Sequence, residues 1–183
     1  ILRNAVDARF FHAPRSRPPA AGRPLRIISS AWSDNPRKGG PLYRWLDEHL
    51  DTRRFSYTFV GRVRESFTHI RHVGALPSRA LGALLREHDL YITASQNEPC
   101  SNALLEAMAC GLPALYLDQG GHGELVGLGG LPFQGEADVL AQLDRLAARV
   151  DDYRAMIWQP TIEEVAARYI ELARMIVDDA PGA

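Results

Sequence analysis

A strand, a polar turn and a helix follow one another between residues 90 and 111, and this unit constrains the fold most. Residues 90–94 form an apolar run with a β-branched member, as a buried strand requires. Ser101 is a typical N-cap residue, and the helix predicted after it ends at Gly111. The first N–H groups of a helix lack intrahelical acceptors and lie at the positive end of its dipole. The unit therefore predicts a binding place for an anion, most often a phosphate.

Two carboxylates bracket the start of this helix. Glu98 lies in the turn, and Glu106 lies eight residues later, roughly 12 Å away along a helical backbone. Two carboxylates that flank one scissile bond are roughly 5 to 10 Å apart, so this pair is too widely spaced for that role. The spacing suits an extended ligand such as a nucleotide sugar, with its sugar at Glu98, its phosphates at the helix start and its ribose at Glu106. The alternative for Glu106 is a solvated helix residue.

The same alternation of strand and helix runs through the rest of the chain. Further strands are predicted at residues 25–31, 55–60, 70–73 and 114–117. Helices are predicted to begin near Pro41, at an N-cap Ser78, over residues 135–150, and at a capping box of Thr161 and Glu164. The pattern indicates an α/β fold with a Rossmann-like parallel sheet and helices on both faces. Ligands of such sheets bind beyond the carboxyl ends of the strands.

Lys38 is the only lysine among 21 basic residues, and it lies in the polar turn after the first predicted strand. Its ammonium is a compact charge with three donors, which suits phosphate oxygens. Gly39 and Gly40 follow it and allow the backbone to approach a neighbour or a ligand closely. Chance is the alternative explanation for the single lysine.

Composition excludes several other classes of protein. The formal net charge of the 183 residues is -1, which argues against nonspecific nucleic-acid binding. No apolar run approaches the roughly 18 residues of a membrane span. Cys100 and Cys110 are at opposite ends of one predicted helix, roughly 15 Å apart, so we expect reduced thiols and a cytoplasmic location. No group of His, Cys and carboxylate residues has metal-ligand spacing.

Four segments carry a resemblance to a known family. E-P-C-S-N-A-L-L-E-A-M-A-C-G-L-P resembles the E-x7-E motif of the C-terminal, donor-binding domain of retaining GT-B glycosyltransferases of the family 4 type. In matching order, N-A-V-D with Phe10 and Pro14, P-R-K-G-G, and G-G-H-G-E-L-V resemble three other elements of that family.

The resemblance implies one half of a GT-B architecture. Residues 1–24 are then a linker, residues 25–183 a nucleotide-sugar-binding Rossmann-like domain, and the N-terminal acceptor domain is absent. The implied reaction moves a sugar from a nucleoside diphosphate to a glycan, lipid or small-molecule acceptor, with retained anomeric configuration and no metal or other cofactor. The implied partners are the nucleotide-sugar donor and the missing domain. The implied location is cytoplasmic, or peripheral to the inner membrane through that domain.

The resemblance also assigns roles to residues. Lys38 and Glu98 are the expected catalytic residues, and residues 74–76 are expected to line the nucleobase pocket. His122 is expected in an exposed glycine-rich turn, where it contacts the donor or has no role. The complete set of expected donor-binding residues is Arg37, Gly39, Gly74, Ala75, Leu76, Cys100, Ser101, Asn102, Ala103, Glu106, Gly121 and His122.

One position departs from the family pattern. Ser33 occupies the place where an arginine usually shares the diphosphate charge, with Arg37 or Arg62 as possible substitutes. Two other functions therefore remain open: another GT-B enzyme such as a sugar-nucleotide epimerase, or a non-catalytic nucleotide-sugar-binding module. The apolar stripe of the last helix is predicted to belong to the core, with part of it bare where the other half of the architecture is missing.

Overall fold

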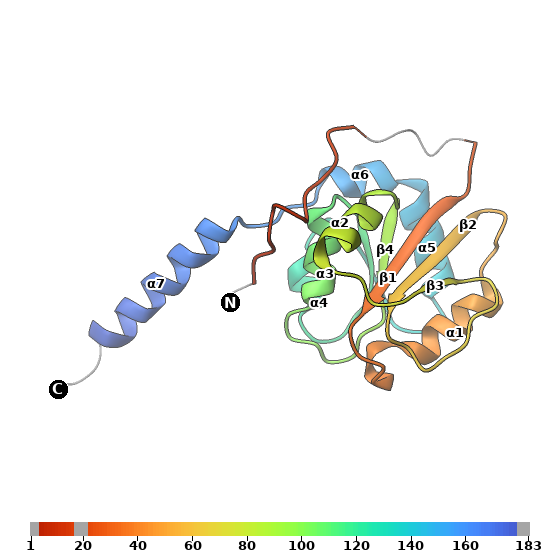
Figure 1. Ribbon diagram of the computed structural model, residues 1–183, viewed down its shortest axis with the longest axis horizontal. Coiled ribbons are helices and arrows are strands. Elements are labelled where there is room, and N and C mark those ends of the chain that lie inside the picture. The colour runs from red at the N-terminus through yellow and green to blue at the C-terminus, as the bar shows by residue number, and fades with distance from the viewer. Residues whose placement is uncertain (1–3, 17–21, 179–183) are drawn as a thin grey trace.

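The computed structural model describes residues 4–16 and 22–178 and shows one parallel sheet covered by helices on both faces (Figure 1). The strand order is β3-β2-β1-β4-β5-β6, and every neighbouring pair is parallel. The strands are β1 (Leu25–Ala31), β2 (Phe55–Gly61), β3 (Arg71–Val73), β4 (Leu90–Thr93), β5 (Ala114–Leu117) and β6 (Gly130–Phe133). The predicted Rossmann-like sheet is confirmed, and its order reverses between β1 and β4, where such sheets bind ligands.

The helices connect these strands as right-handed α/β topology requires. They are the 3-10 helix η1 (Pro36–Lys38), α1 (Gly40–His49), α2 (Ser78–Arg86), α3 (Asn102–Ala109), α4 (His122–Val126), α5 (Val139–Ala148), α6 (Val150–Ala155) and α7 (Ile162–Asp178). Side chains of α1 and α5 pack on one face of the sheet, and those of α2, α3 and α4 pack on the other. The central strands β1, β2, β4 and β5 are rich in apolar residues because both of their faces are covered.

Two predicted helix starts are confirmed by their caps. The Ser101 hydroxyl accepts from the Leu104 N–H at 3.4 Å, so Ser101 is the N-cap of α3. Thr161 and Glu164 form the reciprocal capping box, with 3.2 Å from the Glu164 N–H to the Thr161 hydroxyl and 2.8 Å from the Thr161 N–H to the Glu164 carboxylate.

The predicted cap of α2 is wrong. Pro77 is the N-cap residue of α2 and Ser78 is already helical, without a capping hydrogen bond, because proline holds the extended backbone conformation that an N-cap needs.

The helix predicted over residues 135–150 is present but shorter, as α5. The Asp138 carboxylate accepts from the N–H groups of Gln134 and Gly135, which stabilises a turn and delays the start of α5 to Val139. A second helix, α6, follows α5. The structure also adds α4 and β6, for which the sequence analysis predicted no elements.

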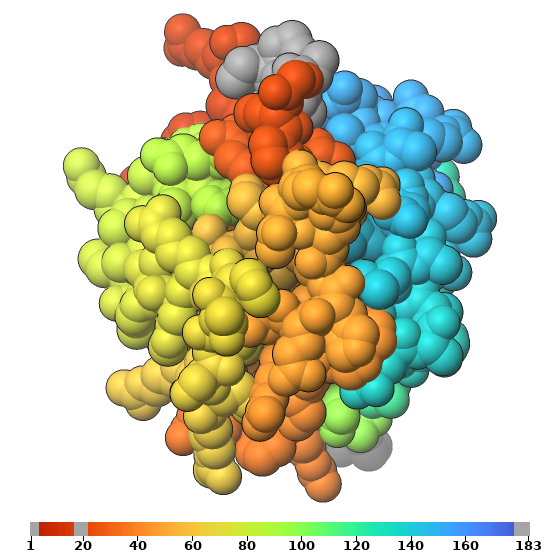
Figure 2. Space-filling model, turned by 90° about the vertical axis from the view of Figure 1, so that its right-hand side faces the viewer, coloured from red at the N-terminus to blue at the C-terminus, as the bar shows by residue number. Residues whose placement is uncertain are grey.

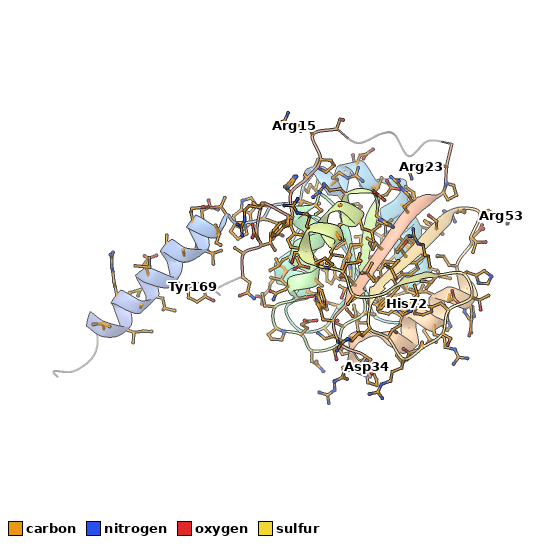
Figure 3. The ribbon with its side chains drawn as sticks, viewed as in Figure 1. Arg15, Arg23, Asp34, Arg53, His72 and Tyr169 are labelled. Carbon is orange, nitrogen blue, oxygen red and sulfur yellow. The ribbon has the colours of Figure 1, made fainter. Side chains whose placement is uncertain are left out.

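The prediction that the stripe of α7 belongs to the core is wrong. The helix extends away from the body of the domain, and its Tyr169 points into open space (Figures 1 and 3). Tyr169, Leu172 and Ile176 are 47%, 42% and 64% exposed, because no other described element lies against this helix. No helix in the described part of the chain is long and apolar enough to cross a membrane.

The N-terminal segment of residues 4–16 lies against the α2 and α3 side of the domain. Phe11 is buried in that core cluster, and Arg86 donates to the Phe10 carbonyl oxygen at 2.7 Å. Residues 1–3 and 17–21 of the predicted linker lie outside the described residues.

Candidate functional site

The turns after β1 and β4 meet at the reversal point of the sheet. Lys38, at the end of η1, and Glu98, in the turn before α3, form an ion pair with 2.9 Å between the lysine Nζ and the carboxylate Oε1. The two side chains are 34% and 20% exposed, so the pair is accessible to a ligand from solvent. The structure therefore brings together the two residues that the sequence analysis selected for catalysis.

Backbone contacts fix the turn of Lys38 against the end of β4. The Gln96 N–H donates to the Arg37 carbonyl oxygen at 2.7 Å. Gly39 has a φ of 90°, and a Cβ there would collide with Ala94 and lie 2.8 Å from its carbonyl oxygen. The buried Tyr43 hydroxyl accepts from the Ala94 N–H at 3.0 Å. Glycine at position 39 is therefore required both for its backbone conformation and for this close approach.

The glycine-rich turn after β5 supports Glu98 from the other side. The Gly121 N–H donates to the Glu98 carbonyl oxygen at 2.9 Å. Gly120 has a φ of 63°, and a Cβ there would lie 2.5 Å from that same carbonyl oxygen, while one on Gly121 would collide with the Pro99 carbonyl oxygen. Gly121 thus holds the Glu98 loop through its backbone N–H.

The amino end of α3 lies beside the ion pair and has unused donors. The Ser101 cap satisfies the Leu104 N–H, and the first helical hydrogen bond goes from the Leu105 N–H to the Ser101 carbonyl oxygen. Among the described residues, the N–H groups of Cys100 to Ala103 have no acceptor. These donors, with the helix dipole behind them, form an arrangement suited to a phosphate. Asn102 is exposed, and its side chain accepts from the Asn4 amide at 2.8 Å.

Glu106 is half-buried one turn further along α3. Its Oε2 is excluded from solvent and has no hydrogen-bond partner among the described residues. Burial raises the pKa of Glu106 to about 7, and its charge also contributes to the raised pKa of the neighbouring Tyr91 hydroxyl. Glu106 is therefore not a solvated helix residue. An unpaired buried acceptor is costly, and a ligand hydroxyl would satisfy it.

His122 is not in an exposed turn, as expected, but is fully buried at the first position of α4. Its Nδ1–H donates to the Leu117 carbonyl oxygen at 3.0 Å, which leaves Nε2 as an acceptor. Nε2 is buried and has no partner in residues 4–16 and 22–178. The burial of His122 was missed because the short helix α4 was not predicted. The first turn of α4 places the His122 ring against Tyr116, at a centroid distance of 6.4 Å.

The expected nucleobase loop, residues 74–76, follows β3 and lies on the side of β1 opposite to β4. Ala75 and Leu76 line a hollow of only about 10 Å³ together with Trp32 at the end of β1, and Gly74 is exposed beside it. Trp32 is 53% exposed, and the sequence analysis assigned it no role. The exposed indole at the carboxyl end of the first strand leaves an aromatic face open to solvent. A single aromatic residue after a strand matches no motif, so the sequence carried no signal for it.

Ser33 has a structural role in the turn after β1. Its hydroxyl accepts from the Asn35 N–H at 3.2 Å, and the Asn35 side chain in turn accepts from the Arg37 N–H at 3.0 Å. Arg37, next to Lys38 in the chain, and Arg62, directly after β2, are both exposed. Cys100 and Cys110 form no disulfide. Within the residues that the structure describes, no three His, Cys, Asp or Glu side chains cluster as metal ligands would.

Comparisons with known proteins give the family and the fold of this chain. The sequence profile of the family described as "Glycosyl transferases group 1" matches residues 44–152, more than half of the chain. The chain belongs to this family. No curated protein sequence matches it.

Solved structures show the same fold in GT-B glycosyltransferases. The sucrose-phosphate synthase of Thermosynechococcus elongatus superposes with a TM-score of 0.70 at 18% identity, over 96% of this chain and 52% of that one. HepE of Anabaena, in complex with UDP-glucose, gives 0.68 at 17% identity, over 97% of this chain and 57% of that one. The C-terminal domain of a group 1 glycosyl transferase (LpcC) of Francisella tularensis gives 0.65 at 18% identity, over 90% and 98%. The chain thus spans about half the length of the first two and nearly all of the third, which is a single domain.

Proposed function

We propose that this chain is the donor-binding domain of a retaining glycosyltransferase of the family 4 type, which transfers a sugar from a nucleoside diphosphate to an acceptor. The observation that carries the proposal is the Lys38–Glu98 ion pair beside the unused N–H groups at the start of α3. A positive side chain and a helix amino end suit a diphosphate, and the adjacent carboxylate suits sugar hydroxyls. The solved complex of HepE with UDP-glucose supports this donor class.

In this proposal each residue has one task. Lys38 and the N–H groups of residues 100–103 bind the diphosphate and stabilise the negative charge that grows on it as the sugar leaves, which is preorganised electrostatic catalysis. Glu98 exchanges its bond with Lys38 for bonds to sugar hydroxyls. Glu106 accepts a ribose hydroxyl, and the buried His122 Nε2 accepts from the donor sugar. The site uses no metal, since the lysine and the helix dipole supply the positive charge.

The nucleobase is proposed to lie on the other side of β1. Residues 74–76 would contact its edge through backbone groups, and Trp32 would stack on its face. Backbone recognition explains why residue identities alone do not name the base.

Part of the proposed enzyme lies outside this domain. The exposed apolar side chains of α7, and the length of the superposed proteins, support a further domain that covers this helix and carries the site for a glycan, lipid or small-molecule acceptor. A cytoplasmic location, soluble or at the inner membrane through that domain, is part of the same proposal.

Thermal unfolding of the 183-residue chain with UDP, GDP and ADP in turn tests donor binding. A nucleotide at about 100 times its dissociation constant adds about 2.7 kcal/mol to the free energy of unfolding. We expect this gain with one of the three, a smaller gain in Lys38→Ala, and an unchanged gain in the control Arg44→Ala, which removes an exposed cation of α1 that pairs with Glu48. An equal gain in Lys38→Ala and wild type would contradict the proposed phosphate site.

A further inference from the structure

A second cavity lies at the amino ends of the strands, away from Lys38 and Glu98. It arises because β3 pairs only with residues 58–60 of β2, so Phe55, Ser56 and Tyr57 have no strand beside them at that edge. The cavity has a volume of about 390 Å³, within the range of small-molecule sites. Figure 2 faces this edge of the molecule.

One part of the cavity wall is apolar and another part is polar. Leu46, Leu50, Ile70 and Leu84 supply aliphatic surface from α1, the loop before β3, and α2. The polar lining consists of Arg26, Asp47, Thr52, Ser56, Thr58, His69, Arg71, Glu87 and His88.

Several of these polar groups are already satisfied within the fold. The buried Asp47 carboxylate accepts from three successive backbone N–H groups, those of residues 68–70, at 2.6 to 2.8 Å. His88 donates from Nδ1 to the Leu84 carbonyl oxygen at 2.8 Å, and its Nε2 accepts from the Thr58 hydroxyl at 3.0 Å. These side chains shape the cavity but have little capacity left for a ligand.

Arg26 differs from them. Its Nε is buried and has no hydrogen-bond partner among the described residues. The nearest carboxylate is that of Asp89, 3.5 Å from Nε. That carboxylate already accepts from two Arg23 nitrogens at 2.6 and 2.8 Å and from the Arg26 backbone N–H at 2.8 Å. The Arg26 guanidinium thus lines the cavity, and among the described residues its ion pair with Asp89 is a 3.5 Å contact in which Nε makes no hydrogen bond.

A second guanidinium lines the same cavity from β3. Arg71 is exposed and belongs to none of the ion pairs in the described part of the chain. Two arginines beside aliphatic surface match a ligand with one charged end and one apolar end, because guanidinium groups bind carboxylates and phosphates in paired hydrogen bonds.

We propose that this cavity binds a small molecule in which one anionic group, a phosphate or a carboxylate, is joined to an apolar ring or chain. Arg26 and Arg71 hold the anion, and Leu50 and Leu84 contact the apolar part. Glu87 and the charged Asp47 in the lining disfavour a polyanion, so a nucleoside diphosphate is a poor fit. The site is independent of the proposed donor site and does not rest on the proposed function.

Amide chemical shifts of the ¹⁵N-labelled chain test this assignment, with phenyl phosphate, benzoate and benzyl alcohol as probes. We expect saturable shifts at residues 69–71 with one or both anions, which identifies phosphate or carboxylate as the preferred group, and none with neutral benzyl alcohol. Arg26→Gln should weaken binding about tenfold or more, because a hydrogen bond to a charged group is lost. The control Arg53→Gln removes a nearby arginine whose side chain is 90% exposed (Figure 3) and should bind as wild type does.

The exposed Arg71→Gln is a second variant that leaves the core intact, and it should also weaken binding. If Arg26→Gln does not fold, the affinity of Arg71→Gln tests the proposal. The proposal is overturned by shifts confined to residues 100–103, by equal shifts with benzyl alcohol, or by wild-type affinity in a folded Arg26→Gln or in Arg71→Gln.

Discussion

Carboxylates at the two ends of the parallel strands differ in how many hydrogen-bond partners they have. At the amino ends, Asp89 and Asp47 are each buried and each accept three hydrogen bonds. At the carboxyl ends, the half-buried Glu106 has one oxygen without any partner among the described residues, and Glu98 is held by a single lysine. The first pair stabilises the fold, whereas the second pair keeps hydrogen-bonding capacity for a ligand.

The pKa values express the same difference. Burial raises the pKa of Asp89, but the Arg23 guanidinium and the Arg26 N–H outweigh it and hold the pKa at about 2. Glu106 has no such donors, so burial raises its pKa to about 7. Unsatisfied carboxylates therefore reduce stability near neutral pH, and this cost is typical of functional groups.

The largest expected effect is that of Glu98→Gln on catalysis. The amide cannot pair with Lys38 as the carboxylate does, nor accept sugar hydroxyls with the same strength, so kcat/KM should fall by about a hundredfold or more. The measurement is transfer by a form of the protein that includes the acceptor site. The exposed Glu48→Gln is the control, and activity that survives Glu98→Gln would favour the non-catalytic module.

The next effect is on the fold, at the other end of the strands. Asp89→Asn should lower the free energy of unfolding at pH 7 by about 2 kcal/mol, because the native pKa is about 2 and the unfolded value is 3.8. Since the native pKa is depressed, this stability is present above about pH 4 and is lost as the pH falls through 2. Urea unfolding from pH 2 to pH 7 should show a flatter dependence in the variant, and parallel curves would refute the assignment.

Glu106→Gln should act in the opposite direction. The native pKa is raised from 4.5 to about 7, so wild type is stabilised below pH 4.5 and loses that stability as the pH rises through 7. At pH 8 the variant should be more stable than wild type by about 3 kcal/mol and should bind the nucleotide less tightly. Denaturant midpoints and nucleotide titrations at pH 5 and pH 8 measure both. A variant that is less stable at pH 8 would show that Glu106 is structural.

The smallest effect is expected for Tyr43→Phe. It leaves the buried Ala94 N–H without its acceptor, at a cost of about 1 kcal/mol, and loosens the contact between the turns of Lys38 and Glu98. Burial raises the pKa of Tyr43 to about 12, so the hydroxyl is neutral and the effect should not depend on pH between 6 and 9. Nucleotide affinity should fall less than in Lys38→Ala, and an equal fall would make Tyr43 part of the binding site itself.

The sequence predicted those parts of the fold that local patterns determine. The strands of the sheet interior are rich in apolar residues, and the capping residues Ser101 and Thr161 have direct local partners, so all of these were found. Ser78 failed as a cap because the preceding Pro77 already has the required backbone conformation. The start of α5 was placed too early because the turn at Asp138 depends on the geometry of three residues rather than on periodicity.

The candidate site was only partly predictable, since its energetics depend on contacts between distant segments. Lys38 and Glu98 were selected from their separate motifs, but their ion pair at 2.9 Å depends on the tertiary structure. The burial of His122 and the exposure of α7 depend on what lies opposite each element, which periodicity does not reveal. Trp32 was missed because a single aromatic residue after a strand has no motif.

The glycine contacts around Glu98 also limit how this site can evolve. Gly39 and Gly120 both have positive φ and both touch the segment from Ala94 to Glu98, so any side chain at either position collides with that segment. Mutations that change the ligand preference of this site while preserving the fold are therefore expected elsewhere, in exposed positions such as Ala75, Asn102 and Trp32. The constrained loops would stay constant across a lineage while the exposed positions diverge, and specificity would change without any movement of the central ion pair.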